Sequence, residues 1–107
     1  MSQAFQSAAA TEVDLLAAAV LGCPAVVSLD SGGPRFVATY LPGRRVGGVR
    51  VDDKLVEVAV VAAAGIPVPA VASQVRSAVA ALAAGRAVDV HIADVAPTGE
   101  RGSAEPA

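Results

Sequence analysis

The segment Val49–Leu82 constrains the fold more than any other part of the chain. It opens with VRVDDKLVEVAVVAAAG, which reads as a short apolar strand, a polar turn and a long apolar strand. The motif GIPVP (Gly65–Pro69) follows, and apolar residues then recur at helical intervals. Glycine tolerates the positive φ of a tight corner, and proline is favoured at the start of a helix. The segment therefore predicts a β-hairpin followed by an amphipathic helix.

Upstream of this segment the sequence predicts another helix. Thr11 and Asp14 have the spacing of an N-terminal capping box, and apolar residues follow at helical intervals. Gly22 and Pro24 are residues that typically end a helix. We therefore expect a helix over residues 12–21, preceded by a disordered lead over residues 1–10.

Two short apolar segments lie between this helix and Val49. Residues 25–29 and 36–41 flank the sequence DSGGP, whose residue types favour turns. The two segments are expected to pair as a hairpin. Residues 41–48 (LPGRRVGG) are rich in glycine and are expected to form a flexible connection.

The C-terminal part predicts one more strand, because Val88, Val90 and Ile92 alternate with Asp89 and His91. A strand that follows a strand–helix unit in the same sheet runs parallel to the first strand. The whole pattern predicts the order α-β-β-β-β-α-β in an α+β fold: a small, mostly antiparallel sheet of about four to five strands with two helices on one face. We expect one domain over residues 11–95 and a disordered tail over residues 96–107.

Composition limits the classes of function. The 107 residues suit one domain, and the net charge of −2 provides no strong field toward nucleic acid or a membrane. The N-terminus lacks the basic region of a secretory signal, and no apolar run reaches the roughly 18 residues of a membrane span. A single cysteine, Cys23, excludes an internal disulfide. These features predict a cytoplasmic protein.

The sequence shows no catalytic, cofactor-binding or metal-binding motif. Cys23 follows a predicted helix C-terminus, where the helix dipole disfavours a thiolate, so we interpret it as a packed thiol. His91 lies on the same strand face as Asp89 and is interpreted as a surface histidine. With one histidine and one cysteine, a zinc site would need carboxylates from distant positions and is not predicted.

Two surfaces remain as candidates for binding. The long strand is apolar on both faces, and its second face carries the candidate interaction surface Leu55, Glu57, Ala59 and Val61. The loop before Val49 carries the candidate basic loop Arg44, Arg45 and Arg50. A glycine-flanked basic loop can bind phosphate, although this loop lacks the closing glycine of a GxxG motif and the sequence has no GxxxxGK[ST] motif.

Residues 12–95 resemble the bacterial alkaline shock protein family, also called the Gls-type envelope stress response family, in its short actinobacterial form. The resemblance is carried by GVRV (Gly48–Val51), LVEVAVVAAAGIPVP (Leu55–Pro69), the helix that contains Gln74, and VDVHIADV (Val88–Val95). It implies a non-enzymatic cytoplasmic protein that responds to envelope or alkaline stress, self-associates, and is tethered to the membrane through an anchored partner.

These observations leave two hypotheses. The first is a scaffold or protein-interaction module that forms homo-oligomers and binds a membrane-anchored protein. The alternative is a phosphate- or RNA-binding α+β module that uses Arg44, Arg45 and Arg50. The scarcity of aromatic residues, 3% of the chain, argues against the alternative, because single-stranded nucleic acid is usually bound by base stacking.

Overall fold

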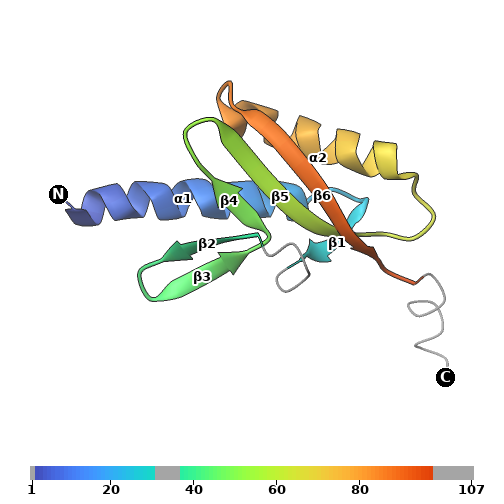
Figure 1. The fold of residues 1–107 in the computed structure, drawn as a ribbon, viewed down its shortest axis with the longest axis horizontal. Helices are drawn as coiled ribbons and strands as arrows, with labels where there is room; N and C mark the ends of the chain where they lie inside the picture. The colour runs from blue at the N-terminus through green and yellow to red at the C-terminus, as the bar shows by residue number, and fades with distance from the viewer. Residues whose placement is uncertain (1, 31–36, 98–107) are drawn as a thin grey trace.

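The computed structural model describes residues 2–30 and 37–97, and it places two helices against one face of a four-stranded sheet (Figure 1). A separate two-stranded hairpin lies beside this sheet. The predicted α+β class is confirmed, and one additional strand, β3, is present. The elements are α1 (Ser2–Leu21), β1 (Val26–Leu29), β2 (Ala38–Leu41), β3 (Arg44–Gly47), β4 (Val49–Val51), β5 (Leu55–Ala62), α2 (Val68–Ala83) and β6 (Ala87–Val95).

Strand β5 is the centre of the main sheet. One of its edges pairs with β6 in parallel along its whole length, from Leu55 opposite Ala87 to Ala62 opposite Val95. Its other edge is shared by two antiparallel partners, since β4 pairs with residues 56–58 and β1 with residues 60–62. The predicted parallel pairing between the long strand and the last strand is therefore confirmed.

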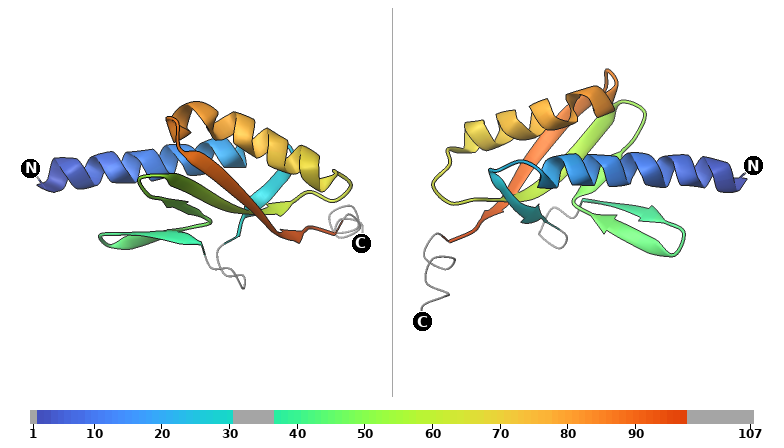
Figure 2. Two further views of the ribbon diagram at one scale, coloured as in Figure 1. Left: turned by 45° about the horizontal axis from the view of Figure 1, so that its top comes forward. Right: turned by 180° about the vertical axis from the view of Figure 1, so that it is seen from behind.

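The core lies between the helices and one face of the sheet. Both helices cover the same face, as the tilted view in Figure 2 shows. Alternate residues of β5 point into this core, as the two-residue period of a strand requires. The buried residues of β5 and the helices that belong to this core cluster are Val13, Leu16, Val20, Val56, Val58, Val60, Ala62, Val71, Val75, Val79 and Ala83. We call the opposite face of the main sheet its open face.

The first helix is longer than predicted. It begins at Ser2, so the expectation that residues 1–10 form a disordered lead is wrong for residues 2–10. The segment SQAFQSAAA is rich in alanine and contains neither glycine nor proline, and alanine has the highest helix propensity. Thr11 is consequently an exposed residue inside the helix instead of its N-cap.

The predicted hairpin between residues 25–29 and 36–41 is also wrong. Strand β1 pairs with β5. Strand β2 pairs with β3, and β3 lies in the segment 41–48 that was expected to be a flexible connection. Pro42 and Gly43 form the turn, with a φ of 78° at Gly43. Proline followed by a residue of positive φ is typical of a type II turn, so this local turn competes successfully with the longer DSGGP connection.

The DSGGP turn and the tail lie mostly outside the described residues, which include only Asp30 of the former and Ala96 and Pro97 of the latter. The N–H of Ala96 donates to the carbonyl of Ala62 at 2.8 Å, which extends the β5–β6 pairing by one bond. Within residues 2–30 and 37–97, no helix is long and apolar enough to cross a membrane.

Candidate functional site

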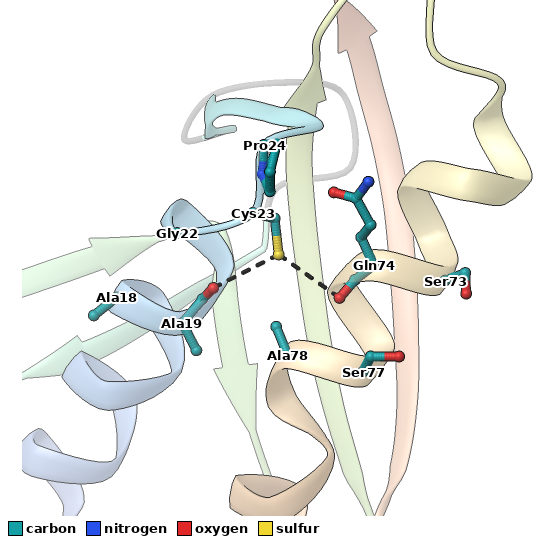
Figure 3. Close-up of a pocket in the computed structure, with 9 residues that line it drawn as sticks. All are labelled: Ala18, Ala19, Gly22, Cys23, Pro24, Ser73, Gln74, Ser77 and Ala78. Carbon is teal, nitrogen blue, oxygen red and sulfur yellow. Dashed lines mark hydrogen bonds between the residues drawn. The ribbon is translucent and has the colours of Figure 1, made fainter.

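The outer surface between the two helices contains a groove of about 620 Å³ (Figure 3). It lies between the C-terminal end of α1 and the middle of α2. We call it the helix groove, and it is lined by Ala18, Ala19, Gly22, Cys23, Pro24, Ser73, Gln74, Ser77 and Ala78. Every one of these residues is uncharged. A hollow of this composition suits an apolar or uncharged protein surface, because the centres of protein interfaces are depleted in charge.

The helix groove forms because the two helices carry small side chains where their outer surfaces meet. Ala18 of α1 and Gly22, just after its end, lie one helical turn apart, and Ser77 and Ala78 contribute from α2, with the Ala78 side chain pointing toward Cys23 (Figure 3). These side chains are too short to fill the space between two helices. Pro24 lacks the N–H that a helix requires, so the chain leaves α1 at this point and turns toward β1.

Cys23 lies at the inner side of the helix groove. Its Sγ atom is 3.7 Å from the carbonyl oxygen of Ala19 and 3.7 Å from that of Gln74, so it touches both helices (Figure 3). Burial raises the pKa of the Cys23 thiol above its ordinary value of 9.0. The thiol is therefore protonated at neutral pH and poorly nucleophilic, which agrees with the packed thiol expected from the sequence.

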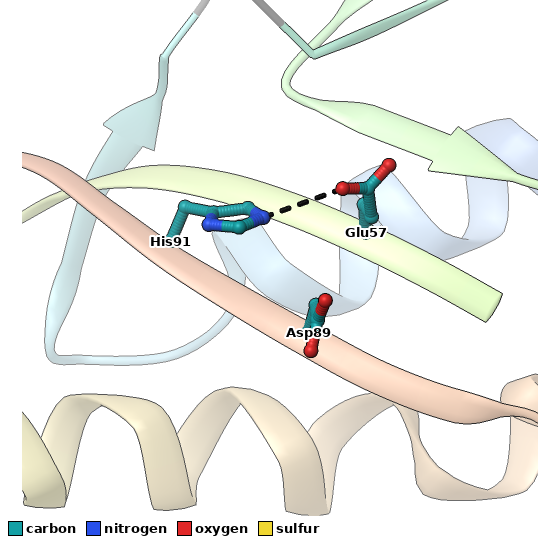
Figure 4. Close-up of side chains that lie close together, drawn as sticks. All are labelled: Glu57, Asp89 and His91. Carbon is teal, nitrogen blue, oxygen red and sulfur yellow. Dashed lines mark hydrogen bonds and ion pairs between the residues drawn. The ribbon is translucent and has the colours of Figure 1, made fainter. Parts of the chain in front are cut away.

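Three polar side chains gather on the open face of the sheet. Glu57 of β5 is in register with Asp89 of β6, and His91 follows two residues later on the same strand face (Figure 4). His91 Nε2 is 3.4 Å from Glu57 Oε2. The metal-ligating atoms of Glu57, Asp89 and His91 all lie within 4.8 Å of one another. We call these three residues the sheet-face cluster.

Sequence reasoning identified only part of this cluster. The alternation along the last strand correctly placed Asp89 and His91 on one face. It did not identify Glu57, which is 34 residues from His91, because the register of two parallel strands has no local signature in the sequence. The sequence predicted no metal site because one would need carboxylates from distant positions in the chain. The neighbouring strand β5 supplies such a carboxylate, Glu57.

The predicted interaction surface on β5 is only partly exposed. Ala59 is completely buried, which contradicts its assignment to a binding surface, whereas Leu55 and Val61 are half-buried. The N–H of Ala59 donates to Gly48, and its carbonyl accepts from Asp30. Gly48 and Asp30 therefore continue the backbone pairing along this edge of β5, between its partners β4 and β1.

The three arginines of the predicted basic loop do not converge on one point. Arg44 donates two hydrogen bonds to Asp14 of α1, at 3.2 and 2.9 Å, and Arg50 donates to Glu57. Arg45 follows Arg44 along β3, and successive strand residues point to opposite sides. A phosphate bound by all three arginines would have to replace both carboxylates and also rearrange the hairpin.

Comparison of the chain with models of known protein families, with curated proteins and with solved structures found no match.

Proposed function

We propose that this protein is a non-enzymatic scaffold that self-associates through the helix groove and belongs to the envelope or alkaline stress response, as the resemblance of its sequence implies. The observation that supports the proposal is the groove itself, about 620 Å³ of uncharged hollow on the outer surface of two helices. A monomer gains nothing from leaving such a hollow unfilled, whereas a second copy gains apolar burial by filling it.

A second copy suits the helix groove because the same surface carries a matching protrusion. Leu15 is 50% exposed and precedes Ala18, Ala19 and Gly22 by three, four and seven residues. This spacing places Leu15 on the face of α1 that lines the groove. A two-fold axis beside the groove would bring Leu15 of each copy to the hollow of the other, which is the self-complementary arrangement of a symmetric dimer.

The chemistry of the described residues favours a binding role over catalysis. The thiol in the helix groove is buried and has a raised pKa, and its Sγ contacts the backbone carbonyls of Ala19 and Gln74, neither of which is a base. Nucleophilic catalysis requires an activated group within hydrogen-bond reach of its base. The residues of the groove contribute shape and apolar contact instead of reactivity.

The test is to fill the helix groove and measure self-association. Ala78 lines the groove and is exposed, so Ala78→Trp fills the hollow without entering the core. We expect sedimentation equilibrium to show oligomers of the wild-type protein and at least a 10-fold larger dissociation constant for the variant. Ala80→Trp is the matched control, because Ala80 is exposed on the same helix and does not line the groove.

Two results would contradict the proposal. One is a wild-type protein that remains monomeric at all concentrations up to the millimolar range. The other is an oligomer that tolerates Ala78→Trp as well as Ala80→Trp, which would assign self-association to another surface.

The cellular role is tested in a bacterial strain that lacks the gene. We expect the wild-type chain and Ala80→Trp to restore growth after a shift to alkaline pH, and Ala78→Trp to fail at equal abundance. Part of the wild-type chain should cosediment with membranes in a manner that depends on an anchored partner, because no described helix could cross the membrane. Full rescue by Ala78→Trp would separate the stress role from the groove.

A further inference from the structure

We propose that Glu57, Asp89 and His91 form a binding site for a divalent transition-metal ion, with Zn²⁺ as the best fit. The site lies on the open face of the sheet, away from the helix groove, and it is independent of the self-association proposed above. Its two carboxylates and one imidazole supply three ligands of the types that Zn²⁺ takes in proteins.

The geometry of the sheet-face cluster is close to that of a metal site. Bonds of about 2.0–2.1 Å to zinc imply a separation of roughly 3.3 Å between two ligands of a tetrahedral ion. His91 Nε2 and Glu57 Oε2 are 3.4 Å apart, so they need little movement. Asp89 is exposed, and the ligand atoms of the cluster are within 4.8 Å of one another, so a rotation of its carboxylate would complete the set.

The backbone holds the three ligands in place. Asp89 and His91 are two residues apart on β6 and therefore project from the same face, and β5 places Glu57 opposite Asp89 (Figure 4). Ligands that come from two hydrogen-bonded strands, here the central strand β5 and its neighbour β6, are positioned more rigidly than ligands on loops. Three protein ligands leave one position for water, the arrangement that an accessible zinc ion adopts.

The surroundings allow a cation to enter and favour its retention. The side chains of Glu57 and His91 are 15% and 23% exposed, so they are largely shielded from water, whereas Asp89 is open to solvent. The two carboxylates together carry two negative charges, which match the charge of the ion. Partial burial strengthens this attraction, because the local dielectric is lower than that of water.

Arg50 is the natural competitor of the metal. Its guanidinium donates to Oε1 of Glu57, the oxygen that does not face His91, and its side chain is 53% exposed. Binding of a dication next to this guanidinium costs electrostatic energy. Removal of Arg50 should therefore increase metal affinity, an effect that a purely structural role of the Arg50–Glu57 pair does not predict.

The test is titration of the untagged chain with ZnCl₂ by calorimetry, and with Co²⁺ by visible absorption, which reports coordination geometry. All variants carry Cys23→Ser, because a thiol also binds zinc. We expect one ion per chain, at least 10-fold weaker binding in Asp89→Asn and in His91→Gln, and several-fold tighter binding in Arg50→Ala. Asp94→Asn is the matched control, because Asp94 is an exposed carboxylate of the same strand outside the cluster.

The absence of stoichiometric binding would overturn the proposal. So would binding that Asp89→Asn and His91→Gln leave unchanged, since this would show adsorption elsewhere on the chain. Asp89 is exposed, so its conservative substitution keeps the test valid even if the His91 variant proves unstable; circular dichroism checks that each variant is folded.

Discussion

The side-chain oxygen Oε1 of Gln74 accepts a hydrogen bond from the backbone N–H of Ala25 at 3.1 Å, although 49 residues separate the two in sequence. Ala25 is fully buried, and its carbonyl accepts from the N–H of Ala63 at 2.8 Å. Gln74 therefore links α2 to the connection between α1 and β1. This contact also holds the two sides of the helix groove together, because Gln74 is one of its lining residues.

We expect Gln74→Leu to destabilise the protein by about 1–3 kcal/mol, because it leaves the buried N–H of Ala25 without an acceptor. Gln74→Glu keeps an oxygen at the same position and should lose less stability. Urea denaturation at neutral pH measures both free energies of unfolding. A leucine variant as stable as the wild type would show that the hydrogen bond contributes nothing.

Gly48 should tolerate no side chain. Its φ is +86°, and an added Cβ would lie 2.8 Å from Leu29 Cβ and 3.0 Å from the carbonyl oxygen of Ala59. The backbone conformation alone costs alanine about 1–2 kcal/mol, and the contact with the backbone adds to this cost. We expect Gly48→Ala to destabilise the protein by about 3 kcal/mol or more, or to prevent folding.

Gly43 is the matched control for this prediction. It also has a positive φ, +78°, but an added Cβ would meet no atom within 4 Å. Gly43→Ala should therefore cost only the conformational part, about 1–2 kcal/mol. Equal losses in the two variants, measured by thermal and urea denaturation, would contradict the steric argument.

Arg86 connects the end of α2 to the first helix. Its guanidinium donates to the carbonyls of Ala83 at 2.8 Å and Leu82 at 3.1 Å, and to the carboxylate of Glu12. The carbonyls belong to the last turn of α2, where a cation is favoured by the helix dipole. Because the Arg86 side chain is only 17% exposed, we expect Arg86→Ala to cost about 1–3 kcal/mol of unfolding free energy.

The control for Arg86 is the exposed Arg76 of α2, whose replacement by alanine should change stability by less than about 0.5 kcal/mol. Chemical denaturation of both variants in one buffer provides the comparison. A similar loss in the two proteins would mean that the contacts of Arg86 are not what stabilises the fold.

The hydrogen bonds of Asp52 predict that the free energy of unfolding decreases at acid pH. Its Oδ1 accepts from the N–H groups of Lys54 and Leu55 at 2.8 and 2.9 Å, and these bonds lower the pKa of the carboxyl below its ordinary value of 3.8. The folded state therefore binds the proton more weakly than the unfolded chain. The resulting stabilisation is present above about pH 4 and is lost as the pH falls through the lowered pKa.

The measurement is the free energy of unfolding between pH 2.5 and 6 for the wild type, for Asp52→Asn and for the neighbouring control Asp53→Asn. The difference between the wild type and Asp52→Asn should shrink as the pH falls below 4. A difference that stays constant over this range would show that the ionised carboxylate does not contribute.

The sequence predicted those parts of the fold that depend on local patterns. The β4–β5 turn at Asp52, the alternation of β5, the Gly65–Pro69 corner and the helix α2 each have residue types that favour one backbone conformation. The N-terminal limit of α1 was missed because alanine-rich composition without glycine or proline extends a helix past a good capping residue. The pairing of β1 was missed because strand partners are chosen by packing, and a nearby turn sequence is only one contribution to that choice.

By itself, the sequence determined the α+β class, the order of the predicted strands and helices, and the parallel return of β6 beside β5, since periodicity, turn residues and the handedness of crossovers act within short stretches of chain. Only the tertiary structure decided that Glu57 lies beside His91, that Ala59 is buried, that two arginines are occupied by carboxylates, and that small residues of two helices leave a groove. Each of these features joins residues that are far apart in the chain, and their proximity depends on sheet register and helix packing, which no local sequence pattern encodes.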